Sequence, residues 1–156
     1  MHDTGTATET FILCELAGAA YAIPSRLVQH VEMVEQITPV PNAPACVEGV
    51  VFSRGQVIPA LNLRQRFGFE KQPHDLRTRL IVIQALGRTV GLIVDTAREF
   101  LAIPPDAFRP PPAGIGNLSG DYLEGIATVG ERLILLLNVD QVLAVADGVA
   151  SLQVAQ

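Results

Sequence analysis

The sequence predicts an all-β fold in which two small barrels share a core. Short apolar stretches alternate with turn residues along most of the 156-residue chain, and a spacing of about 8–12 residues between strands is typical of barrels and sandwiches. The alternation of strands and long helices that a parallel sheet requires is not present. Because the strands are many and their connections short, two barrels are favoured, although a single sandwich also fits the periodicity.

The expected strands are apolar segments separated by Gly, Pro and polar residues. The prolines between 39 and 44 exclude regular structure there, and those at 104–105 and 110–112 bracket a loop that we expect to run to about Gly120. The expected strands are 11–16, 21–23, 28–34, 47–52, 56–58, 80–83, 90–94, 97–103, 122–129 and 132–137.

The hairpin between residues 47 and 58 is the clearest local signal. Ser53, Arg54 and Gly55 form its turn, and Gly55 readily supplies the positive φ that a tight hairpin needs. The packing of a hairpin tip gives no reason for an arginine at position 54, unless its guanidinium reaches back to a carboxylate. A partner contact and an internal salt bridge therefore both remain open for Arg54.

Two short helices are expected beside the strands. Residues 63–67 have room for one or two turns, ended by Gly68. Near the C-terminus, apolar residues from Val139 to Ala146 recur at helical spacing, which predicts a helix packed on the body of the protein.

Composition argues against nucleic acid as a partner. The net charge is −5, charged residues are 17 % of the chain, and there are two Tyr, six Phe and no Trp. A nucleic-acid binder normally carries a basic stripe, often with aromatic side chains for base stacking.

Motifs for enzyme, cofactor or metal chemistry are missing from the sequence. Cys14 and Cys46 form no paired CxxC motif and are expected to be buried thiols. The glycine-rich stretch 114–120 follows a triple proline and does not have nucleotide-loop spacing. We expect no catalytic residue, no cofactor and no metal. Scattered carboxylates are expected on the surface, at Asp95, Glu99, Asp121, Glu124 and Asp140.

Targeting signals are also missing. The N-terminus is polar, without a basic start followed by an apolar run. The densest apolar run, residues 133–137, is far shorter than the roughly 20 residues that span a bilayer. We expect a cytoplasmic protein without membrane insertion.

The order of segments resembles the CheW family of chemotaxis coupling proteins from about Phe11 to Leu143. The most specific stretch is Val47 to Arg64, VEGVVFSRGQVIPALNLR, which is similar to the family signature in spacing and residue type. The further matching segments, in order, are Tyr21–Ile23, Thr38–Pro41 with Pro44, Gly91–Asp95 and Tyr122–Ile126. The chain departs from the family pattern at Ser53, where the signature has Asn, at Asn62, where it has Asp, and at His30, where members often carry Glu.

The resemblance implies two intertwined five-stranded barrels with short helices, and a role as a non-enzymatic adaptor. One barrel would dock the regulatory domain of a CheA-type histidine kinase. The groove between the barrels would hold the cytoplasmic tip of a chemoreceptor. The CheW-like domain would span residues 10–146, between a flexible N-terminal tail, 1–9, and a C-terminal tail, 147–156.

An adaptor needs an exposed apolar strip and a polar rim rather than a catalytic group. Several valines are available for the strip, including Val50 and Val94. The candidate partner-binding residues are Arg54, Val28, Val31, Ser53, Gly55 and Val90.

Two alternatives stay open. An adaptor of a non-flagellar chemosensory pathway, controlling pili or a second messenger, would share the fold and differ in partner. A small-barrel module for a ligand or an oligonucleotide would also explain the strands, but the negative charge and the few aromatic residues disfavour it.

Overall fold

The computed structural model describes residues 8–111 and 122–144, and it consists mainly of antiparallel strands. The strands are β1 Glu9–Leu16, β2 Ala19–Pro24, β3 Val28–Met33, β4 Val47–Ser53, β5 Gln56–Asn62, β6 Arg79–Ala85, β7 Arg88–Val94, β8 Thr96–Ile103, β9 Phe108–Arg109, β10 Leu123–Val129 and β11 Arg132–Leu137. The helical turns are η2 Ser25–Leu27, α1 Leu63–Arg66, η3 Pro105–Ala107 and α3 Val139–Val142.

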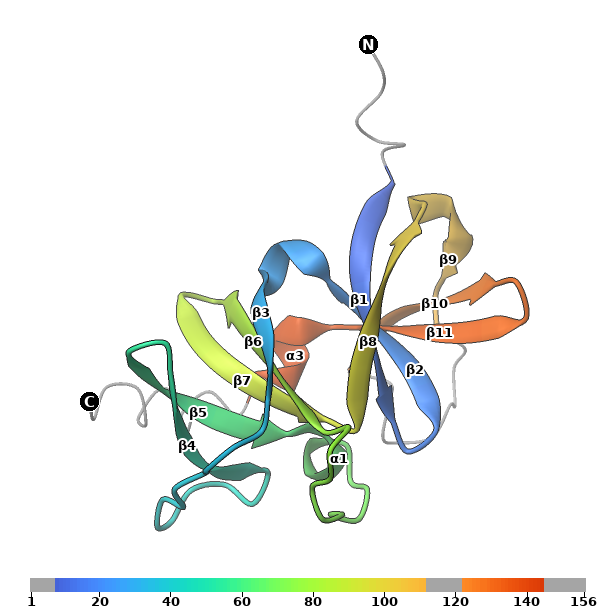
Figure 1. Ribbon diagram of the computed structural model, residues 1–156. Coiled ribbons are helices and arrows are strands. Elements are labelled where there is room, and N and C mark those ends of the chain that lie inside the picture. The colour runs from blue at the N-terminus through green and yellow to red at the C-terminus, as the bar shows by residue number, and fades with distance from the viewer. Residues whose placement is uncertain (1–7, 112–121, 145–156) are drawn as a thin grey trace.

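The strands form two sheets, each wrapped around its own apolar interior (Figure 1). Barrel A has the strand order β8-β1-β2-β11-β10-β9, and barrel B has the order β3-β6-β7-β5-β4. The chain runs from β2 of barrel A into β3 of barrel B, and from β7 of barrel B back into β8 of barrel A. Barrel B is therefore inserted between β2 and β8 of barrel A, and the chain crosses twice between the intertwined barrels.

The two barrels are built from equivalent pieces. Glu48-Gly49 in β4 and Glu124-Gly125 in β10 are 76 residues apart, as are Asn62 at the end of β5 and Asn138 directly after β11. Both first strands have a register shift next to that glycine. In barrel B, β5 pairs in parallel with β7, and in barrel A, β11 pairs in parallel with β2. Both asparagines cap the helix that follows, through a side-chain oxygen that accepts from a backbone N–H.

Barrel B closes through a single backbone bridge. Thr38 and Val50 exchange two hydrogen bonds, 2.9 Å and 2.8 Å long, so the segment after β3 meets the outer edge of β4. Gly49 allows this approach, because a Cβ at that position would lie 2.1 Å from the Thr38 carbonyl oxygen, and φ is +153°. In barrel A the equivalent contact is made by β9, which pairs with Ile126 and Ala127 of β10.

A third apolar layer lies between the barrels and is larger than either interior. On β6, Ile81 and Ile83 face this middle layer, whereas Leu80 and Val82 face the interior of barrel B. Both faces of the central strands are thus buried, which explains why these segments read as continuous apolar runs rather than as an alternation.

One ion pair ties the two barrels together at the edge of the middle layer. Arg64 in α1 donates to both carboxylate oxygens of Asp95, with distances of 2.8 Å and 2.7 Å. Asp95 also accepts from the backbone N–H of Ala17, in the β1–β2 turn of barrel A. The Asp95 side chain raises the pKa of the Arg64 guanidinium by accepting its hydrogen bonds. The Asp95 side chain is 32 % exposed, so it lies at the surface as expected, but no sequence pattern indicated its ion pair with Arg64.

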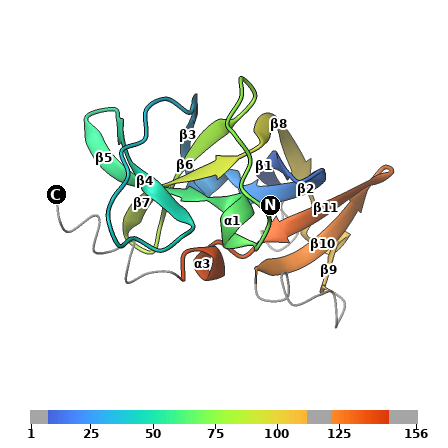
Figure 2. The same cartoon turned by 90° about the horizontal axis from the view of Figure 1, so that it is seen from below.

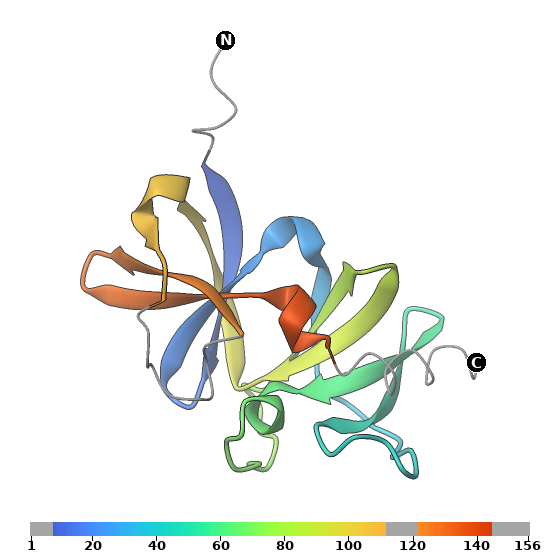
Figure 3. The same cartoon turned by 180° about the vertical axis from the view of Figure 1, so that it is seen from behind.

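The two α-helical turns lie close to each other, as Figure 2 shows. Arg66 of α1 donates to the backbone carbonyls of Val142 and Gln141, and its guanidinium lies 4.7 Å from the ring centre of Tyr122. Figure 3 shows α3 returning from barrel A toward barrel B, where Arg66 holds it. Val142 is fully buried in the middle layer.

The structure confirms the all-β, two-barrel fold and corrects several details. β9 lies inside the expected proline-rich loop, because its backbone finds a partner in β10, and barrel A therefore has a sixth strand. β1 begins at Glu9, inside the segment expected to be a tail. The helix near the C-terminus is described only as Val139–Val142. The end of the loop at 112–121, the glycine-rich stretch 114–120 and Ala146 lie outside the described residues.

Truncating a side chain in the middle layer should weaken both barrels together. Leu92 is fully buried there, so Leu92→Ala should lower the free energy of unfolding by about 2–5 kcal/mol, with one cooperative urea transition. Leu133 is 59 % exposed, and Leu133→Ala is the matched control, with a loss below about 0.5 kcal/mol. Separate transitions for the two barrels would contradict a shared layer.

Candidate protein-docking site

The β4–β5 hairpin places Arg54 at an exposed tip with an unusual backbone. Arg54 has φ +52° and Gly55 has φ +82°, so both central residues of this two-residue turn have positive φ, as a type I′ turn requires. Glycine adopts this conformation freely, whereas a residue with a Cβ pays roughly 1–2 kcal/mol. The hairpin thus keeps an arginine at a position where its backbone favours Gly or Asn.

The Arg54 side chain has no salt bridge with the part of the chain that the structure describes. Arg54 is exposed and borders a shallow pocket of about 350 Å³ together with Gln29, His30 and Ser53. The alternative of an internal ion pair therefore has no support among these residues. A guanidinium with its donors free is suited to a bidentate contact with a carboxylate of another protein.

Beside this tip, side chains link the edges of β3 and β4. Ser53 is buried, and its hydroxyl donates to Glu32 at 2.7 Å. His30 Nε2 lies 2.6 Å from the same Glu32 oxygen and 3.1 Å from the Ser53 hydroxyl, so a proton on Nε2 would be donated to the carboxylate. Ser53 therefore joins β4 to β3 and helps to close barrel B, and its buried side chain is not available to a partner.

The predicted valines differ in their availability. Val28 and Val31 lie on β3, half-buried against the middle layer, so part of each side chain remains accessible at the junction between the barrels. Val90 has no exposed surface, and its assignment as a contact residue is wrong, because β7 is buried on both faces. Val94 is buried in the same layer, whereas Val50 is half-buried on β4.

Two exposed large apolar residues on β3 and β4 were not among the candidates. Phe52 on β4 is 74 % exposed, and Met33 at the end of β3 is 49 % exposed. On β4, residues 47, 49, 51 and 53 are buried and the others are not. Phe52 therefore shares its face with Glu48 and Arg54. Because side chains alternate between the two faces of a strand, the charged residues at the even positions 48 and 54 were the sequence signal that Phe52 is exposed.

The described residues show no arrangement suited to metal or nucleophile chemistry. No group of three His, Cys, Asp or Glu side chains in this part of the chain could hold a metal ion. Burial raises the pKa of the Cys14 thiol to about 12, and burial also raises the pKa of Cys46. Both thiols are therefore protonated and poor nucleophiles at neutral pH. None of the described helices is long and apolar enough to cross a membrane.

Comparison with known proteins agrees with this geometry. The model of the CheW-like domain family matches residues 10–147. The chain belongs to this family. It is 30 % identical to the chemotaxis protein CheW of Klebsiella aerogenes, over 89 % of this chain and 84 % of that protein. It is 29 % identical to the protein FrzA of Myxococcus xanthus, over 88 % of this chain and 86 % of the relative.

A solved structure shows the same family fold. The crystal structure of the scaffolding protein TtCheW from Thermoanaerobacter tengcongensis superposes with a TM-score of 0.78 at 30 % identity, covering 85 % of this chain and 90 % of that one.

The family-like segments have different roles in this structure. Arg64 and Asp95, which end two of them, form the ion pair between the barrels. Asn62 caps α1 and also donates to Glu48, whose carboxylate lies 3.1 Å from His74. These residues hold the fold together, and Arg54 is the arginine of the signature segment that has no salt bridge among the described residues.

Replacing Arg54 by Asn should stabilise the protein. Asn tolerates positive φ and is favoured before Gly in a type I′ turn, so Arg54→Asn should raise the free energy of unfolding by about 0.5–1 kcal/mol. Urea unfolding of the variant and the parent protein measures the difference. A clear loss of stability would mean that the Arg54 side chain supports the fold after all.

Replacing Ser53 by Ala should weaken the link between β3 and β4. The variant leaves Glu32 without the 2.7 Å hydrogen bond, which should cost about 1–2 kcal/mol of unfolding free energy. Ser25→Ala is the control, because the half-buried Ser25 side chain forms no hydrogen bond with the part of the chain that the structure describes. Thermal melts of both variants measure the loss of stability. Equal losses for the two variants would show that the hydrogen bond between Ser53 and Glu32 does not stabilise the fold.

Proposed function

We propose that this protein is a non-enzymatic adaptor that couples the cytoplasmic tip of chemoreceptors to the regulatory domain of a CheA-type histidine kinase. The observation that carries the proposal is the exposed Arg54 at a hairpin tip, without a salt bridge to the described residues, within a family whose members include chemotaxis and scaffolding proteins. An exposed guanidinium without an ion pair in the described part of the chain is best explained by a carboxylate of a partner. The adaptor would work in the cytoplasm, without cofactor or metal.

The kinase contact would use the tip of barrel B. Arg54 supplies charge, and Phe52 and Val50 supply apolar surface on the same face of β4. Such a surface, with an arginine beside an aromatic side chain, has the composition of an interface hot spot. The buried area would be on the order of 1,000 Å² or less in total, as suits contacts that exchange.

The receptor contact would use the junction between the barrels. Val28 and Val31 line β3 where it packs on the middle layer, and both remain half-exposed. A helical tip laid along β3 would cover these side chains without disturbing the residues below them. This surface differs from the Arg54 tip, so one adaptor could hold both partners at once.

Arg54→Ala tests the kinase contact. The variant should lower assembly of the receptor–kinase complex at least tenfold, while the melting temperature should change little, because Arg54 pairs with no charge among the described residues. Arg109→Ala, at an exposed arginine of β9 in barrel A, is the matched control and should assemble normally. A pull-down of the ternary complex paired with a thermal melt gives both numbers. Full kinase activation by Arg54→Ala would reject the site while leaving the adaptor role open.

A further inference from the structure

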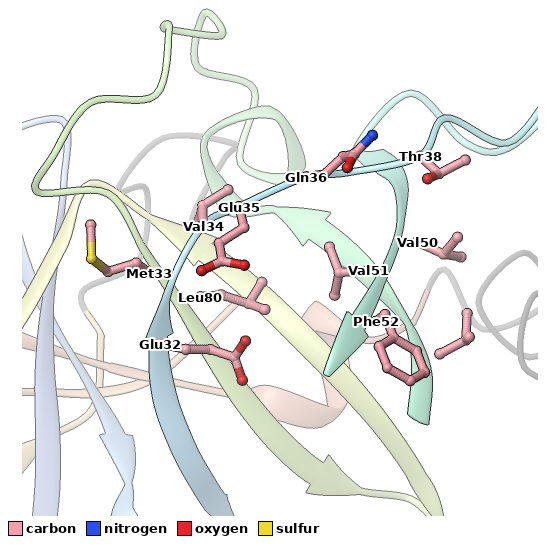
Figure 4. A pocket seen from close by; sticks show the side chains of 11 residues that line it. Glu32, Met33, Val34, Glu35, Gln36, Thr38, Val50, Val51, Phe52 and Leu80 are labelled. Carbon is pink, nitrogen blue, oxygen red and sulfur yellow. The ribbon is translucent and has the colours of Figure 1, made fainter. Parts of the chain in front are cut away.

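The gap between the β3 side and the β4 edge of barrel B forms a pocket of about 430 Å³ (Figure 4). We call it the seam pocket. Its floor is apolar, with the buried Val51 and Leu80. Phe52 stands at its far edge, and the carboxylates of Glu32 and Glu35 lie in the space between the two sides. The pocket is bounded by the Thr38–Val50 bridge at one end and by the Glu32–Ser53 hydrogen bond at the other.

The backbone of β4 is open toward this pocket. Val50 directs its N–H and C=O at Thr38, away from β5. Because alternate residues of a strand point to the same edge, Phe52 directs its N–H and C=O to the same side. The Thr38–Val50 bridge is isolated, so β4 offers a donor and an acceptor there. An unpaired strand edge is a ready template for another strand.

The charge of the seam pocket selects its occupant. None of the described residues that line it is Lys, Arg or His, whereas Glu32 and Glu35 are both present. The carboxylate of Glu32 is already in hydrogen-bond contact with His30 and Ser53. Glu35, in contrast, is exposed and has no salt bridge among the described residues. An apolar floor under an acidic rim complements an apolar side chain flanked by basic ones.

We propose that the seam pocket binds an extended segment of a partner protein, which pairs its backbone with Phe52 and places an apolar side chain between flanking Lys or Arg residues. The volume suits about three residues. The seam pocket shares Phe52 and Val50 with the kinase contact proposed above, but Arg54 is not in its lining, and its test with a free peptide does not involve the kinase.

The test uses the isotopically labelled full chain and the probe peptide acetyl-Arg-Leu-Arg-amide, followed by amide chemical shifts. Saturable shifts centred on Val51, Phe52 and Glu35 are expected at about millimolar peptide, because so short a segment buries little surface. Acetyl-Glu-Leu-Glu-amide should bind at least tenfold more weakly. The affinity for the basic probe should fall as NaCl is raised, since Glu35 is solvent-exposed.

Matched variants separate the two parts of the proposal. Glu35→Arg should lower the affinity for the basic probe at least fivefold. Glu131→Arg, at an exposed carboxylate of the β10–β11 turn, should leave this affinity unchanged. A probe with an N-methylated leucine cannot donate to the Phe52 carbonyl and should bind at least fivefold more weakly. Equal binding of the acidic and basic probes, or shifts centred elsewhere, would overturn the site. Unchanged binding of the methylated probe would overturn the backbone pairing.

Discussion

The apolar layer between the two barrels is the constraint on which the rest of the structure depends. β6 and β7 have one face in the interior of barrel B and the other in this layer, so an isolated barrel would expose side chains such as Ile81, Ile83 and Leu92 to water. Barrel B is formed by the consecutive strands β3–β7, and barrel A by the strands before and after them. The Arg64–Asp95 pair links α1 to the crossover from β7 to β8, through a bidentate contact, and Asp95 also accepts from Ala17 of barrel A.

This arrangement leaves function to the periphery. The central strands are buried on both faces, so among the described residues the exposed surfaces include the junction, the hairpin tips and the outer edges of β3 and β4. The strand edges of barrel B are the more open ones, because its edge strands are joined by one backbone bridge and a few side-chain hydrogen bonds. In barrel A a paired strand, β9, covers the equivalent edge. The duplicated architecture has thus diverged where partners would bind.

The sequence predicted the fold better than the site, for identifiable physical reasons. The hairpin at Gly55 was legible because a positive φ leaves a local trace. Val90 was misassigned because a strand buried on both faces shows no alternation that distinguishes inside from outside. β9 has only two residues, and its pairing with β10 is a tertiary contact without a local signal. The Arg64–Asp95 pair likewise joins residues far apart in the chain. Phe52 was within reach, since its parity with Arg54 placed it on the outer face.

Co-sedimentation with receptor-bearing membranes tests the adaptor account most directly. Membranes carrying the chemoreceptor are mixed with the kinase, with and without this protein, and the kinase in the pellet is measured. The kinase should sediment with the receptor only when this protein is present, because it would hold the receptor at the junction between the barrels and the kinase at the Arg54 tip. Equal kinase in the pellet without the protein, or displacement of the receptor by the kinase, would contradict it.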